Sequence, residues 1–224
     1  MNKNTRRTLL KTIAAAGLLE GAGLSGLISN VLAKGNSPVA AGLRKITGTV
    51  TVNGASASVG MLIKAGDTVT TGAASEAIYV IDQDAFLQRD NSSVVFGDSA
   101  SEFFRVVTGK ILSVFGQGQK KLHVATATIG IRGTGCYIES TPEKTYFCLC
   151  YGKAEITPTA APEQSETIAT KHHDHPLTIS RDASADSIMA SAPVINHTDV
   201  ELTLLENLVG RRPPFESFDS EILN

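Results

Sequence analysis

Short apolar alternations fill residues 46 to 156, and Gly, Asn or Asp interrupts them about every ten residues. Thr49-Val50-Thr51-Val52, for example, runs into Asn53-Gly54. Both turn residues tolerate a positive φ, so this step predicts a hairpin. No stretch in this range keeps a 3.6-residue apolar period over three turns. The pattern therefore predicts an all-β sandwich, roll or solenoid.

Composition limits the class of protein further. The 224 residues provide room for one ordinary domain and a small appendage. Hydrophobic residues make up 42% and charged residues 19%, which argues against a disordered chain. The net charge of −2 argues against a nucleic-acid-binding protein.

The first 33 residues have the anatomy of an export signal. The segment Thr5-Arg6-Arg7-Thr8-Leu9-Leu10-Lys11 resembles the twin-arginine motif S/T-R-R-x-F-L-K, with Leu9 in place of Phe. A weakly apolar, Gly- and Ala-rich stretch follows and ends in Val31-Leu32-Ala33, which suits a cleavage site. We expect Arg6 and Arg7 to direct the chain through the twin-arginine machinery to the periplasm. If the signal is not cleaved, it would act as an anchor.

Export would bring the chain into an oxidising compartment, and removal of the signal would change the net charge of the remaining protein. Residues 1–33 hold four basic residues and one acidic residue, so the remaining chain has a net charge of −5 and keeps all five His. Proteins that use the twin-arginine route cross the membrane already folded. Any metal ion could therefore be bound before export.

Five sequence pieces in order resemble the periplasmic FecR domain, named for the iron-dicitrate transport regulators. They are Gly48 to Gly54, Gly66 to Gly72, Gly109 to Phe115, Thr126 to Thr134 and Gly152 to Ile156. The match covers residues 44–158. It implies a FecR-like roll or sandwich of short strands and hairpins, with an extracytoplasmic binding or scaffold role.

The chain departs from the sigma regulators of that family. Those regulators carry a cytoplasmic helical segment of tens of residues and then a membrane span, whereas residues 1–33 here have the features of a signal peptide. We therefore expect no interaction with a cytoplasmic sigma factor. A signalling or regulatory role related to the iron-dicitrate regulators is kept as an alternative.

Three cysteines lie close together in the sequence. If 145–151 is a strand, Cys148 and Cys150 share one face because the strand period is two. Cys136 lies on the preceding strand. A register that pairs it with Cys148 or Cys150 brings the thiols within bridging reach, whereas pairing with Leu149 sends it to the other face. The sequence leaves this register open.

Two roles follow for these cysteines. In an oxidising compartment a hairpin disulfide among Cys136, Cys148 and Cys150 would leave one spare thiol. The alternative is a metal site in which the three thiolates are joined by an imidazole. The candidate imidazoles are His172, His173 and His175. Sulfur and nitrogen ligands favour Zn, Cu or Fe over Mg or Ca.

Other sequence features argue against catalysis. None of the cysteines opens a helix, and the sequence has no nucleophile elbow, phosphate loop or paired-carboxylate signature. We expect a protein that is not an enzyme. A thiol-redox protein that uses an unpaired cysteine is the alternative.

Residues 159–224 form a C-terminal extension. A short strand is expected at 177–180, and Thr198-Asp199-Val200-Glu201 is a capping box that predicts a helix over about 198–210. His197 is a further metal candidate, although its position favours a residue at the start of the helix. We expect the extension to fold back over the cysteine hairpin and the whole to act as a periplasmic module with an envelope partner.

Overall fold

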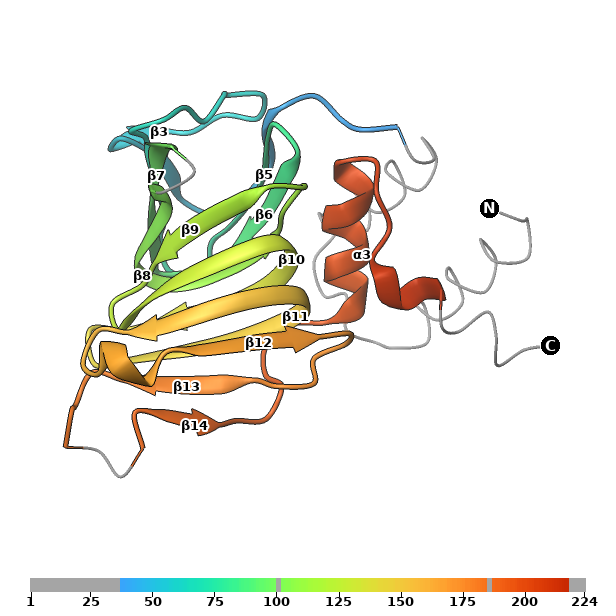
Figure 1. Cartoon of the computed structure of the whole chain (residues 1–224). Helices are drawn as coiled ribbons and strands as arrows, with labels where there is room; N and C mark the ends of the chain where they lie inside the picture. Colours follow the sequence, from blue (N-terminus) through green and yellow to red (C-terminus); the bar gives the residue numbers. More distant parts are fainter. Residues whose placement is uncertain (1–36, 100–101, 185–186, 218–224) are drawn as a thin grey trace.

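Strands dominate the computed structural model, which describes residues 37–99, 102–184 and 187–217 (Figure 1). The expected signal peptide at 1–33, with Arg6 and Arg7, lies outside the described residues. None of the described helices is long and apolar enough to span a membrane. The all-β prediction is confirmed, with α3 as the α-helix of the described part of the chain.

The elements follow one another in chain order. The first nine strands are β1 (Gly42–Thr47), β2 (Val50–Val52), β3 (Ala55–Ser56), β4 (Thr68–Thr71), β5 (Glu76–Ile81), β6 (Asp84–Gln88), β7 (Ser92–Ser99), β8 (Glu102–Val114) and β9 (Gln119–His123). The remaining elements are β10 (Ala127–Ser140), β11 (Lys144–Pro158), the 3-10 turn η1 (Pro162–Gln164), β12 (Glu166–Thr170), β13 (Leu177–Ser180), β14 (Met189–Ser191), helix α3 (Asp199–Leu208) and the 3-10 turn η2 (Pro214–Ser217).

All fourteen strands of the described residues belong to one sheet that folds back on itself. Its main path runs β14-β13-β11-β10-β9-β8-β7-β4-β2-β3, and β5 joins β1 to β6 beside it. The long strands change partner along their length. Strand β10 pairs with β9 through residues 128–132 and with β8 through residues 135–140. This change of partner bends the sheet around an interior.

The strands near the site are longer than the short strands we expected. Strands β8, β10 and β11 contain 13, 14 and 15 residues. Strand β10 continues through a bulge between Arg132 and Cys136, where the glycines bend the strand without ending it. A Cβ atom at Gly135 would lie 2.5 Å from the Tyr151 ring, so the close approach of β10 to β11 requires glycine there.

Two apolar clusters lie on the two sides of the β10–β11 hairpin. The inner cluster lies inside the folded sheet and centres on Phe86, whose ring contacts four other aromatic rings. These are Tyr79, Phe96, Phe104 and Phe115. The outer cluster lies under α3 and includes its four buried leucines, Leu202, Leu204, Leu205 and Leu208. The C-terminal segment therefore supplies one wall of the outer cluster.

The chain after residue 158 continues the same sheet. Strand β12 pairs with one end of β11 and β13 with the other, so the extension folds over the hairpin. The predicted strand at 177–180 is β13. The predicted capping box is present at Thr198 and Glu201, and the helix ends at Leu208, two residues before Gly210.

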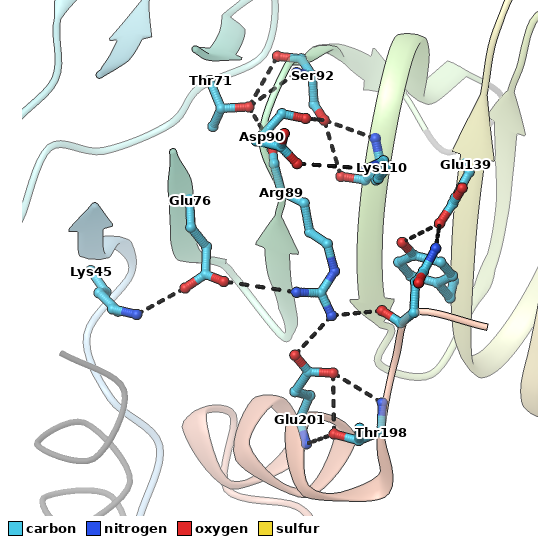
Figure 2. A network of polar contacts seen from close by, with 12 residues as sticks. Lys45, Thr71, Glu76, Arg89, Asp90, Ser92, Lys110, Glu139, Thr198 and Glu201 are labelled. Atoms are coloured by element: carbon cyan, nitrogen blue, oxygen red, sulfur yellow. Dashed lines mark hydrogen bonds and ion pairs between the residues drawn. The ribbon is translucent and has the colours of Figure 1, made fainter. Parts of the chain in front are cut away.

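Polar contacts fix α3 at both ends. Near its first turn, Arg89, which directly follows β6, donates to the Glu201 carboxylate at 2.8 Å and to the Asn196 carbonyl at 2.7 Å (Figure 2). Near its last turn, the buried Glu206 accepts from the Tyr151 hydroxyl and, at 2.6 Å, from Arg211. These contacts hold the segment that contains residues 195–199 against the sheet.

Candidate metal centre

Strand β11 presents two thiols to the outer cluster. Cys148 pairs with Tyr137, and Cys136 pairs with Leu149. Because side chains alternate along a strand, Cys148 and Cys150 point outward and Cys136 points into the inner cluster. All three are free thiols in this structure, so the hairpin disulfide left open by the sequence is not formed.

The turn between β12 and β13 brings His173 onto this patch. The residue has a positive φ of 52°, and its backbone N–H donates to the Cys150 carbonyl at 2.9 Å. The Asp174 carboxylate closes the turn by accepting from the backbone N–H groups of Lys171 and His172. The His173 ring then lies over the sulfur of Cys148, with Nδ1 3.4 Å from Sγ.

His197 enters from the segment before α3. Its ring stacks on Tyr137 with the centroids 4.7 Å apart, and its Nε2 lies 3.1 Å from Nδ1 of His173. The Arg89 contact to Asn196 and the capping box at Thr198 fix the backbone on either side (Figure 2). Three separate segments of the chain therefore meet at one point.

Four ligand atoms converge there. One atom each from Cys148, Cys150, His173 and His197 lies within 4.8 Å of all the others. Ligands of a tetrahedral zinc ion, bound at 2.0–2.3 Å, would lie about 3.3–3.8 Å apart. Cys148 Sγ lies 3.4 Å and His197 Nε2 lies 3.1 Å from Nδ1 of His173, both close to this range. A small shift of the rings would therefore allow the four atoms to enclose one ion.

The far nitrogen of each imidazole is already occupied. Nδ1 of His197 lies 2.6 Å from the Ile195 carbonyl and must donate to it, because a carbonyl accepts hydrogen bonds. Nε2 of His173 lies 3.1 Å from the Asp199 carboxylate. In neutral rings the two facing nitrogens therefore both carry lone pairs. Histidine ligands of metal ions commonly have such outer partners.

The thiol and imidazole groups differ in their acidity. The hydrogen bond from the Cys150 thiol, and then the interactions with the His173 and His197 imidazoles, lower the pKa of Cys148 to about 4, against the effect of burial. Burial opposes a charge on His173, but the hydrogen bonds to Asp199 and Cys148 outweigh it and raise its pKa to about 9. Burial raises the pKa of Cys136 and of Cys150. A positive charge at the centre is therefore favoured, either a proton or a metal ion.

A second group lies beside this centre at the surface. It consists of His172, His173 and Asp199, again with ligand atoms within 4.8 Å of one another. Nε2 of His172 lies 2.9 Å from both carboxylate oxygens of Asp199. The two groups share His173, which contributes a different ring nitrogen to each.

The structure brings some of the metal ligands predicted from the sequence together and separates the others. Cys148, Cys150 and His173 come together, while Cys136 lies on the opposite face and His175 pairs with Glu166 at 3.6 Å. His172 belongs to the surface group. His197 immediately precedes the helix cap, as its sequence position indicated, and this position also places it in the centre. The sequence named His197 as a further metal candidate, and the capping box at Thr198 fixes where the helix after it begins.

Comparisons with known proteins give little further information. No family model matches the chain, and no curated protein matches it. Two crystal structures of a putative anti-sigma factor from Parabacteroides distasonis are distantly similar, with a TM-score of 0.46 and 8% identity. The similar region covers 56% of this chain and 58% of that chain.

Proposed function

We propose that this protein is a non-enzymatic, exported binding module whose C-terminal segment is fixed to its sheet by a metal ion. The ligands would be Cys148, Cys150, His173 and His197. Four ligands from the protein complete a tetrahedral site, which is the pattern of a structural rather than a catalytic zinc site. Two sulfur and two imidazole donors favour zinc, with copper(I) and iron as the competing ions.

One observation carries the proposal. The inward nitrogens of His173 and His197 lie 3.1 Å apart, while their outward nitrogens are held by a carboxylate and a carbonyl. In neutral rings two lone pairs at this distance repel each other, and either a proton on His173, whose pKa is raised to about 9, or a metal ion between the rings removes the repulsion. The two cysteine sulfurs complete the group around the same point.

Burial argues for a structural role over a catalytic one. Cys148, His173 and Asp199 form a chain of hydrogen bonds of the kind that activates a cysteine nucleophile. The side chains of Cys148 and Cys150 are fully buried, however, and a substrate could not reach either sulfur in this conformation. The same burial suits an ion that holds segments of the chain together.

Export is the second part of the proposal, and the paired Arg6 and Arg7 support it. Replacement of both by lysine is expected to leave the protein in the cytoplasm of a host with a twin-arginine system. Fractionation measures this outcome. Export of the double variant at the wild-type level would contradict the proposed route.

Intact mass spectrometry tests the metal site. The protein is measured in native and denaturing solution, and the mass difference reports bound metal while the denatured mass reports disulfides. We expect one metal ion and three free thiols. No bound metal after incubation with zinc, or a loss of about 2 Da from a Cys148–Cys150 disulfide, would overturn the proposal.

Matched variants locate the ligands. Cys150→Ala and His197→Ala are each expected to lower the affinity for zinc strongly, because they remove one of four ligands. Cys136→Ala is the control, since Cys136 is equally buried on the same hairpin but faces the inner cluster. An equal loss in all three variants would show that disturbance of the fold, and not ligation, is responsible.

A further inference from the structure

The proposed ligands differ in their access to solvent. Cys148, Cys150 and His197 are buried, and 11% of the His173 side chain is exposed. His172 and Asp199, which lie next to His173, have exposed fractions of 47% and 48%. The exposed groups that border the buried centre through His173 are therefore His172 and Asp199.

The surface group has the chemistry to bind a cation by itself. The Asp199 carboxylate supplies negative charge, and the His172 imidazole supplies a nitrogen 2.9 Å from both of its oxygens. The Phe215 ring stacks on the His172 ring with the centroids 4.5 Å apart, which holds the imidazole in place. Carboxylate and imidazole are ordinary ligands of zinc and of other divalent transition metals.

We propose that His172 and Asp199 form an entry subsite that captures a divalent transition-metal ion from solvent and delivers it past His173 to the buried centre. This inference rests on the proposed function. The step exchanges ligands around one ion and changes no oxidation state. His173 contacts both groups, with Nε2 toward Asp199 and Nδ1 toward Cys148 and His197.

An entry subsite affects rates and leaves the equilibrium unchanged. His172 is not a ligand of the buried centre, so its loss should raise the barrier to loading and release by the same amount. Asp199 also supports His173 directly, and its substitution would change affinity as well. His172→Ala is therefore the informative variant.

The test uses Co²⁺, whose absorbance reports thiolate ligation, in stopped-flow mixing with the full protein. We expect His172→Ala to slow both loading and release by about tenfold, with an unchanged Kd. His175→Ala is the matched control, because its exposed ring lies in the same turn but pairs with Glu166. This control should load at the wild-type rate.

Three results would overturn the entry subsite. The first is that His172→Ala loads and releases the ion at the wild-type rates. The second is that His175→Ala is slowed as much as His172→Ala. The third is that His172→Ala releases the ion faster but loads it at the wild-type rate, so that its affinity is lower. Each leaves the buried site intact. Failure of the wild-type protein to bind Co²⁺ or zinc would instead overturn the proposed function, and the entry subsite with it.

Discussion

Cys136 and Cys148 occupy opposite faces of one β-hairpin, and both are fully buried. Burial raises the pKa of Cys136, whereas the hydrogen bond from Cys150 and the interactions with His173 and His197 lower the pKa of Cys148 to about 4. The same residue type at the same burial therefore has opposite acid–base behaviour. The difference depends on which part of the chain covers each face.

The inner face is covered by other strands of the sheet, which contribute apolar side chains. The outer face is covered by the turn at 171–175 and by residues 192–217, which bring imidazoles, carboxylates and an arginine along with the leucines of α3. Stability and chemistry are thus divided between the faces. We expect the inner face to hold the fold together without metal, and the outer face to depend on it.

The largest expected effect comes from the inner face. Phe86→Ala removes the ring that contacts four other aromatic rings and should cost about 3–5 kcal/mol of the free energy of unfolding. Urea unfolding measures this cost in the metal-loaded and the metal-free protein. The two values should agree, because distant sites add within about 0.5 kcal/mol.

A difference larger than this between the costs of Phe86→Ala with and without metal would contradict the independence of the two faces. It would mean that the metal centre and the aromatic cluster stabilise each other through the hairpin. Ile138→Ala, on the inner face beside Cys136, is a second variant for this measurement, since Ile138 is fully buried in the same cluster. Its cost should likewise be independent of metal.

Removal of the metal should have an intermediate effect confined to the outer face. A ligand present at a hundredfold excess over its Kd adds about 2.7 kcal/mol to stability, and a chelator should remove this contribution. Hydrogen exchange should rise in α3 and in the turn at 171–175, because these segments supply His197 and His173. Amide protection in β4 and β7 should be unchanged, because their buried apolar side chains belong to the inner cluster.

Cys150→Ala provides the control for this experiment. Because this variant lacks one ligand and binds little metal, addition of the chelator should leave its hydrogen exchange unchanged. Exchange that rises uniformly over both faces of the sheet would contradict a division between them.

The sequence predicted local features well because their causes are local. Asn53 and Gly54 have positive φ values of 52° and 80° at the turn between β2 and β3, as the hairpin pattern predicted. The capping box at Thr198 requires two side chains three residues apart, and it is present. Neither feature depends on the rest of the chain.

The register of the cysteine hairpin could not be predicted in the same way. A turn after Ser140 that is one residue longer or shorter would move Cys136 to the other face relative to Cys148. The meeting of His197 with Cys148 depends on the path of about fifty intervening residues. Contacts of this kind are set by packing, which sequence patterns do not encode locally.

The smallest expected effect tests how the outer face positions its ligand. Thr198→Ala removes the hydroxyl that accepts from the Glu201 N–H at 3.3 Å and should cost about 1 kcal/mol of helix stability. His197 directly precedes this cap, so a loosened cap should also weaken zinc binding, by about fivefold if the whole cost appears in the affinity. A competition titration with a chelator of known affinity measures the change.

Thr198→Ser keeps the hydroxyl and should retain wild-type affinity. If Thr198→Ala lowers the stability of α3 but not the affinity for zinc, then the stacking on Tyr137 and the Ile195 carbonyl suffice to hold the His197 ring. If both fall together, the helix cap and the metal centre form one cooperative unit. In that case a local helix signal, the capping box, positions a metal ligand on the outer face, whereas the inner face depends on apolar packing alone.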